Sequence, residues 1–318
     1  MIRVDGLVKY YGSHRAVSNL NFSVEANQVV GLLGLNGAGK TTILRILAGD
    51  LEASAGSIYV GDQAINKDPI AHRKQVGFLP ERVPLYPQMT VREYLEFLGR
   101  LRGVTASELG ARVLSCCERV GIRDHLDTQL GALSHGYGKR LGIASTLVHN
   151  PKLIILDEPI SGLDPKQIIG MRALVQDLSR DHTVILSSHI LREISRTCDQ
   201  ILVIREGEIA AAGTEDELSK RFTSGQRLRL TLRGEESLVR DFLSSRPELS
   251  SFEILEVEGE TLTAELESED DIAEALVVEI VKAGFGLRAL QSPSDALETT
   301  FMELTAEPDQ NHHEEEEL

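Results

Sequence analysis

The sequence lacks the features of secreted, disulfide-bonded or membrane-spanning proteins. Its three cysteines are too few for a paired framework and show no metal-ligand spacing. No run approaches the ~18 consecutive apolar residues of a membrane span. The first residues, Met1 to Asp5, do not have the pattern of a signal peptide. We therefore expect a protein of a reducing, cytoplasmic compartment.

Positive charge is scarce in the last third of the chain. Residues 1–221 hold 26 Lys and Arg against 25 Asp and Glu, a net charge of +1, whereas residues 222–318 hold 7 against 24, a net charge of −17. This change predicts a domain boundary near Phe222. Because an acidic surface repels a phosphate backbone, we expect no nucleic acid as a partner.

A glycine-rich stretch, residues 34–42, matches the pattern G-x-x-x-x-G-K-[ST] and is called the P-loop below. It follows an apolar segment typical of a buried strand and precedes apolar residues at helical spacing. Backbone N–H groups of such a loop cradle phosphates at a helix N-terminus. Lys40 would reach the terminal phosphates, and the Thr41 hydroxyl would ligate Mg²⁺. Tyr11, shortly upstream, is a candidate for stacking on a purine.

Apolar runs at residues 153–156 and 183–189 predict buried parallel strands, and strands that alternate with helices indicate an α/β fold. Residues 201–211 predict a hairpin. Between the P-loop and these strands, Thr90 to Glu93 and Thr105 to Glu108 read as capping boxes that open two helices. We expect them to form a helical subdomain at about residues 84–150.

The C-terminal part has a different texture. We expect an alternating strand near residue 227, a hairpin over residues 252–266, a helix that ends at Gly284, a strand at residues 287–290 and a last helix after Ser294. These elements predict a small acidic α+β domain over residues 222–307, followed by a disordered acidic tail, residues 308–318.

Polar residues follow the apolar strands. Asp157 and Glu158 come directly after residues 153–156, at the sheet edge where ligands bind in open α/β folds. Asp157 is placed to hold Mg²⁺, and Glu158 to polarise an attacking water. An acidic pair can instead cap a helix. His189 ends the next strand and could contact a γ-phosphate, although a lone histidine is more often structural.

These motifs, in this order over residues 1–220, resemble the nucleotide-binding subunit of an ABC transporter. The P-loop resembles Walker A, residues 153–158 Walker B with the catalytic glutamate, residues 161–164 the D-loop, and His189 the switch histidine. Residues 133–137 resemble the signature motif, whose usual form is LSGGQ. The ending at residues 295–305 resembles the L-E-x-x-F-x-x-L-T ending of exporter-type ATPases, including the gliding-motility and copper-processing group.

The resemblance implies a P-loop NTPase fold with a mixed β-sheet core, the helical subdomain and the small C-terminal domain. It implies ATP and Mg²⁺ as cofactors and assigns roles to named residues. Glu158 and His189 would be catalytic, and Thr41, Glu81 and Asp157 would hold Mg²⁺. ATP would be bound by Tyr11, Ala16, Gly34, Leu35, Asn36, Gly37, Ala38, Gly39, Lys40, Thr41 and Thr42. The residues that act on the nucleotide of a second subunit would be Ser134, His135 and Gly136 of the signature and Asp164 of the D-loop.

The sequence departs from the family pattern at three positions. His135 replaces the first signature glycine, and Tyr137 replaces the signature glutamine. Glu81 stands where the family has the Q-loop glutamine, so the Mg²⁺ site would carry one more negative charge.

What the resemblance implies for function is an ATPase whose two subunits sandwich two ATP molecules and open on hydrolysis. That motion would drive a transmembrane permease, in export, contacted near residues 82–102. The subunits would form a homodimer or a heterodimer at the inner face of the cell membrane. The alternative is a soluble ABC-type ATPase that acts on ribosomes or DNA. Such proteins usually bring two cassettes, a coiled coil or zinc ligands, none of which this sequence has. The acidic domain is either a ligand-sensing or dimerisation module or, as we favour, a packing appendage.

Overall fold

The computed structural model describes residues 2–61, 63–65, 67–222, 226–268, 270 and 272–291. The chain divides into two compact units, Met1–Glu215 and Asp216–Leu318. The composition shifts after residue 221, at the end of helix α8 (Glu215–Phe222), whereas the division by contacts falls at its start. The helix expected after Ser294, the exporter-type ending and the tail 308–318 lie outside the described residues.

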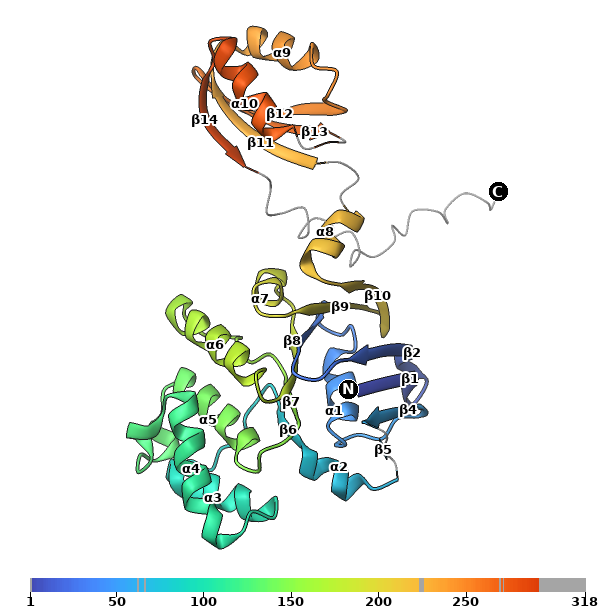
Figure 1. Ribbon diagram of the computed structural model, residues 1–318, viewed down its shortest axis with the longest axis vertical. Helices are drawn as coiled ribbons and strands as arrows, with labels where there is room; N and C mark the ends of the chain where they lie inside the picture. The colour runs from blue at the N-terminus through green and yellow to red at the C-terminus, as the bar shows by residue number, and fades with distance from the viewer. Residues whose placement is uncertain are drawn as a thin grey trace, which may run out of the picture. The chain divides into compact units, whose positions relative to one another are not determined.

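The first unit is built on a six-stranded sheet of order β10-β9-β3-β8-β7-β6 (Figure 1). Its strands are β3 (Val29–Leu33), β6 (Val76–Leu79), β7 (Leu153–Leu156), β8 (Thr183–Ser188), β9 (Gln200–Arg205) and β10 (Glu208–Gly213). All pairings are parallel except the β9–β10 hairpin, which was predicted. Every residue of β3, β7 and β8 is buried, as apolar strands covered on both faces require.

A second sheet in this unit is antiparallel, with the order β2-β1-β4-β5. It comprises β1 (Ile2–Tyr11), β2 (His14–Val24), β4 (Ala55–Val60) and β5 (Gln63–Ala64). Its inward side chains form one hydrophobic core with helix α1 (Lys40–Leu47) and the strands of the six-stranded sheet. Buried and exposed side chains alternate along the first residues of β1, because only one face of this sheet packs on the core.

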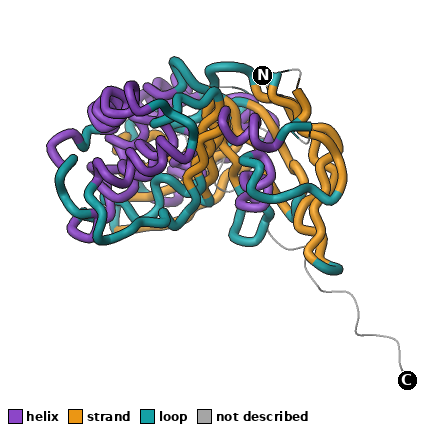
Figure 2. The backbone as a smooth tube through the Cα atoms, turned by 90° about the horizontal axis from the view of Figure 1, so that it is seen from below, coloured by secondary structure: helices purple, strands orange, loops and turns teal. Residues whose placement is uncertain are grey.

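Helices α3 (Val91–Leu101), α4 (Ala106–Val120) and α5 (His135–Leu147) pack together within the range predicted for the helical subdomain (Figures 1 and 2). Thr90 forms the predicted capping box with Glu93. The prediction of the second box is wrong: the Thr105 side chain makes no capping bond to the backbone of α4, and its hydroxyl instead donates to the Glu108 carboxylate at 2.9 Å. The short helices η1 (Arg123–His125) and η2 (Leu130–Ala132) link α4 to α5.

The remaining helices of the first unit are α2 (Pro69–Gln75), α6 (Pro165–Leu178) and α7 (Leu191–Ser195). Asp68 and Asp164 cap α2 and α6, and each of these helices has proline in its first turn. Within the described residues, none of the helices combines the length and apolar content needed to cross a lipid bilayer.

The second unit has its own sheet and core. Its elements are β11 (Gln226–Arg233), α9 (Glu236–Ser244), β12 (Ser251–Glu258), β13 (Thr261–Ser268), α10 (Ala273–Lys282) and β14 (Gly286–Gln291). The sheet order β12-β13-β11-β14 and the β-α-β-β-α-β succession are those of a ferredoxin-like unit. Leu228, Leu230 and Leu232 of β11 meet the inner faces of α9 and α10 in one buried cluster. The predicted hairpin is present as β12 and β13.

Candidate nucleotide-binding site

The P-loop joins the buried strand β3 to the N-terminus of α1, and two of its glycines lie against main chain. A Cβ on Gly34 would lie 2.5 Å from the Ile204 carbonyl oxygen. Gly39 has φ of +105°, and a Cβ there would lie 2.6 Å from the Ala16 carbonyl oxygen. The loop is therefore held by the chain around it, which tolerates only hydrogen at these two positions.

Lys40 lies within the loop that precedes it. Its Nζ donates to the carbonyl oxygens of Gly34 at 2.7 Å and Leu35 at 3.2 Å, and it lies 3.8 Å from Oε1 of Glu158. Burial lowers the pKa of Lys40, and the carboxylates of Glu158, Asp157 and Glu81 oppose that effect. An ammonium group is thus directed at the carboxyl ends of β3 and β7, as phosphate binding requires.

The acidic pair at the end of β7 is held by β8. The Ser187 hydroxyl donates to Oδ1 of Asp157 at 2.6 Å and accepts the Glu158 N–H at 2.9 Å. Asp157 is buried, whereas Glu158 takes a left-handed backbone with φ of +48°. That conformation is rare in residues with a side chain. The two adjacent carboxylates have different partners: Asp157 is bonded to Ser187, whereas Glu158 lies near Lys40 and His189.

His189 follows β8 and meets Glu158. Its Nδ1 lies 3.2 Å from Oε1 and 3.1 Å from Oε2 of Glu158. The two candidate catalytic side chains are therefore in direct contact, and Lys40, the first residue of α1, approaches the same carboxylate. A carboxylate flanked by an imidazole and an ammonium group can accept a proton from a water placed beside it.

A cavity of about 490 Å³ opens over the P-loop and brings most of the candidate residues together. Tyr11, half-exposed at the end of β1, lies at this cavity with Ala16, so the purine-stacking candidate is within reach of the loop. The candidates that line the cavity are Tyr11, Ala16, Leu35, Asn36, Gly37, Gly39, Lys40, Thr41, Thr42, Glu81, Glu158 and His189.

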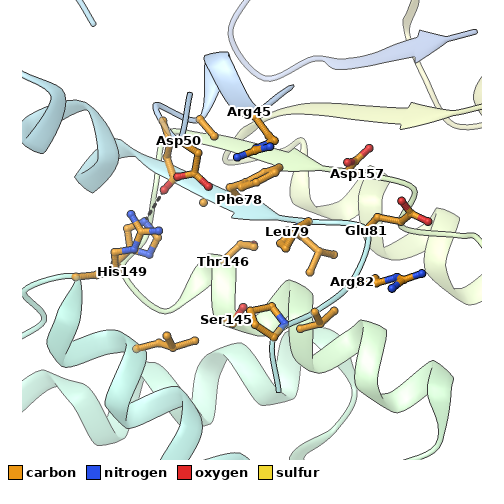
Figure 3. A pocket seen from close by; sticks show the side chains of 18 of the residues that line it. Arg45, Asp50, Phe78, Leu79, Glu81, Arg82, Ser145, Thr146, His149 and Asp157 are labelled. Carbon is orange, nitrogen blue, oxygen red and sulfur yellow. Dashed lines mark hydrogen bonds between the residues drawn. The ribbon is translucent and has the colours of Figure 1, made fainter. Parts of the chain in front are cut away.

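The three candidate metal ligands line an adjoining cavity of about 530 Å³. Figure 3 shows Glu81 and Asp157 at one end of it and His149 at the other. Within the residues that the structure describes, no group of three or more His, Cys, Asp or Glu side chains could hold a metal by itself. A hydroxyl, two carboxylates and oxygens from a bound phosphate nevertheless match the donors that Mg²⁺ prefers, so Thr41, Glu81 and Asp157 fit that ion.

The signature residues do not line the cavity of their own chain. Ser134 caps α5 and accepts the Tyr137 N–H at 3.4 Å. The His135 ring lies over the D-loop, with Nε2 3.5 Å from the Ser161 carbonyl oxygen, and Gly136 faces the Gln167 side chain. Asp164 accepts the N–H groups of residues 166 and 167 as the cap of α6.

The sequence did not predict two residues that bond to the acidic pair. Ser187 carries the bond between β7 and β8, and the signal was a serine pair that ends an otherwise apolar buried strand. Lys139 is buried on α5 beside Glu81 and Glu158, and its only sequence signal is a lysine followed by the apolar part of a helix. Which side chain fills such a position depends on elements that are far apart in the sequence.

A P-loop between a central parallel strand and a helix, with an Asp-Glu pair at the end of a nearby strand of the same sheet, defines a P-loop nucleoside triphosphatase.

The comparisons with known proteins narrow this class. Residues 17–161 match the sequence model of the protein family described as "ABC transporter". The linearmycin resistance ATP-binding protein LnrL of Bacillus subtilis is 30% identical over 306 residues, which cover 96% of this chain and 98% of that protein. The Nod factor export ATP-binding protein I of Bradyrhizobium diazoefficiens is 34% identical over 304 residues, which cover 94% of each chain.

Solved structures agree. The ATP-binding subunit of an ABC transporter superposes with a TM-score of 0.63 at 27% identity, covering 70% of this chain and 93% of that one. A nucleotide-free ATP-binding cassette superposes with a TM-score of 0.64 at 27% identity, covering 69% and 94%. The chain belongs to the ABC transporter family, as one of its ATP-binding subunits. It binds and hydrolyses ATP and powers transport.

Proposed function

We propose that this chain is the ATPase of an exporter, which pairs with a second copy, or a related chain, around two ATP molecules and drives a transmembrane permease. The observation that carries the proposal is the contact of Glu158 with both Lys40 and His189 at the mouth of the P-loop cavity. The names of relatives that align along almost the whole chain, a Nod factor export protein and a linearmycin resistance protein, support the direction.

In this proposal ATP lies along the P-loop. The Tyr11 ring stacks on the adenine, and Ala16 lines the adjacent wall. The loop amides and the N-terminus of α1 bind the phosphates. Lys40 exchanges its two carbonyl partners for β- and γ-phosphate oxygens, since an anion is the stronger partner for an ammonium group.

Thr41, Asp157 and Glu81 would hold the Mg²⁺ of the nucleotide, which neutralises developing charge on the phosphate oxygens. Glu158 accepts a proton from water as the water oxygen bonds to the γ-phosphorus and the bond from phosphorus to the β–γ bridging oxygen breaks. His189, already on the Glu158 carboxylate, orients that group and contacts the γ-phosphate.

The site of one chain is completed by a second chain. Ser134, His135 and Gly136 lie outside the cavity of their own chain, so in the proposed dimer they face the γ-phosphate of the partner's ATP. Ser161 and Gly162, the first two residues of the D-loop, lie beside the signature, where the His135 ring packs on them. Loss of the γ-phosphate removes the contacts that hold the dimer closed.

The permease would dock on the cavity of Figure 3, which is lined by Pro80, Val83, Pro84, Tyr94 and Leu98 between the six-stranded sheet and α3. A hollow that joins the metal-ligand candidate Glu81 to the helical region can transmit a change at the nucleotide to a partner. This proposal places the chain in the cytoplasm at the inner face of the membrane, held there by the permease.

Replacing Glu158 with glutamine tests the catalytic core of the proposal. Glu158→Gln should lower kcat at least about a hundredfold, the usual contribution of a positioned general base, and should leave MgATP affinity within about threefold. The matched control is Glu118→Gln, the same change on a half-exposed residue of α4 that pairs with Arg123. Wild-type turnover by Glu158→Gln would make the catalytic assignment wrong.

Purification from native membranes tests the partner. We expect the chain to copurify with a membrane-embedded protein, and charge reversal of Arg82 on the docking cavity to weaken that association without loss of ATP binding. Copurification with ribosomes or DNA instead would support the soluble alternative.

A further inference from the structure

Lys139, on the signature helix α5, is a buried cation that the proposed reaction does not use. It is 4% exposed. Its Nζ donates to the carbonyl oxygen of Glu158 at 2.9 Å and to that of Glu81 at 3.2 Å. One side chain therefore joins the loop after β7 and the loop after β6 to the helix that begins at the signature.

The two carbonyl groups belong to residues whose side chains do the proposed chemistry. Glu158 is held in a left-handed conformation with φ of +48°, which is unfavourable for a residue with a side chain. The Ser187 hydroxyl accepts its N–H, and Lys139 donates to its C=O. The peptide groups on both sides of its Cα are thus anchored, and the direction of the carboxylate follows from them.

The charge of Lys139 belongs to the same arrangement. Burial lowers its pKa, and the carboxylates of Glu81, Glu158 and Asp157 oppose that effect. A buried ammonium group is stable only with good hydrogen-bond acceptors, and the two carbonyl oxygens provide them. A neutral side chain of similar length would fill the space without fixing either loop.

We propose that Lys139 is a positioning residue for ATP hydrolysis, which fixes the main chain of Glu158 and Glu81 so that the Glu158 carboxylate meets the attacking water. The inference rests on the proposed role of Glu158 as general base. Since Ser134 caps α5, a shift of the signature helix on a partner's nucleotide would reach both carbonyl groups through this one side chain.

The test is steady-state hydrolysis by Lys139→Met. Loss of two charge-assisted bonds to buried carbonyl groups should lower kcat about tenfold or more, while the KM for MgATP stays within about threefold because the P-loop is unchanged. Lys139→Arg keeps the charge and has N–H donors for both carbonyl oxygens, so it should recover kcat to within about threefold of the wild type. If Lys139→Met does not fold, Lys139→Gln is held to the same kcat criterion.

The matched control is Arg140→Met, on the next residue of the same helix. Arg140 also donates to a main-chain carbonyl oxygen, but that oxygen, at 2.7 Å, belongs to Val120, the last residue of α4, and not to the loops that carry Glu81 and Glu158. It should change kcat less than about twofold. Equal loss of kcat in both methionine variants, or wild-type kcat in Lys139→Met, would overturn the inference. Either result beside an inactive Glu158→Gln leaves the proposed function standing, whereas an active Glu158→Gln removes it.

Discussion

Gly37 and Gly39 both have positive φ, but they differ in what surrounds them. Nothing lies within 4 Å of a Cβ built on Gly37, whereas the Ala16 carbonyl oxygen lies 2.6 Å from one on Gly39. The left-handed backbone alone disfavours alanine by about 1–2 kcal/mol. The main-chain contact adds a displacement of the loop, and with it of the phosphate-binding amides.

Gly39→Ala should therefore lower the free energy of unfolding by more than Gly37→Ala, by about 1–3 kcal/mol of additional strain. It should also weaken ATP binding, because Lys40 follows directly. Urea unfolding and equilibrium ATP binding of the two variants measure both effects. Equal losses would show that the approach to Ala16 relaxes at no cost.

His149 gives the first unit a pH dependence. Burial lowers its pKa from 6.5 to about 4, its Nε2 meets the Val76 carbonyl oxygen at 3.1 Å, and its Nδ1 is buried without a partner. Between these two pH values the unfolded chain binds a proton that the folded chain does not, so stability falls as pH falls from about 6.5 to about 4.

His149→Gln removes the group that binds this proton in the unfolded chain, and the glutamine amide keeps a donor for the Val76 carbonyl group. The stability of the variant should fall less steeply between pH 6.5 and pH 4, by up to one bound proton, than that of the wild type. Urea midpoints at pH 5 and pH 7 measure the difference. An unchanged slope would place the acid sensitivity on the two buried histidines, His72 and His182, whose pKa values burial also lowers.

At the scale of elements, α3 and α4 begin with the same four-residue pattern but only one is capped by it. Thr90 Oγ1 accepts the Glu93 N–H at 3.2 Å, and the Glu93 carboxylate accepts the Thr90 N–H at 2.8 Å. The Thr105 hydroxyl donates to the Glu108 carboxylate and makes no capping bond to the backbone. Thr90→Ala should therefore destabilise the first unit by about 1 kcal/mol, and Thr105→Ala by less than half of that, in thermal or urea unfolding. A larger loss for Thr105→Ala would contradict this.

The capping patterns also show how far the sequence leads. Periodicity and glycine placement predicted the P-loop, the buried strands, both hairpins and the α/β class, because each depends on neighbours in the chain. The sequence pattern did not show that β1 belongs to a separate antiparallel sheet, and it did not predict helix α9. The sequence motifs predicted that Glu158 and His189 belong to one site. They did not predict Lys139 and Ser187, because the contacts of these two residues join three segments that are distant in the sequence.

Among the residues that the structure describes, each unit has a hydrophobic core of its own. All the residues proposed to bind nucleotide lie in the first unit, and the second has its own four-stranded sheet. A ligand stabilises only the cooperative unit that binds it, by about 2.7 kcal/mol at a hundred times its Kd. In Glu158→Gln, where ATP persists, MgATP should therefore raise the melting temperature of one calorimetric transition and leave the other in place. Calorimetry of a fragment that comprises Asp216–Leu318 would identify the transition that does not shift. A joint shift of both transitions would mean that the acidic unit unfolds together with the ATPase unit, and that its role exceeds that of a packing appendage.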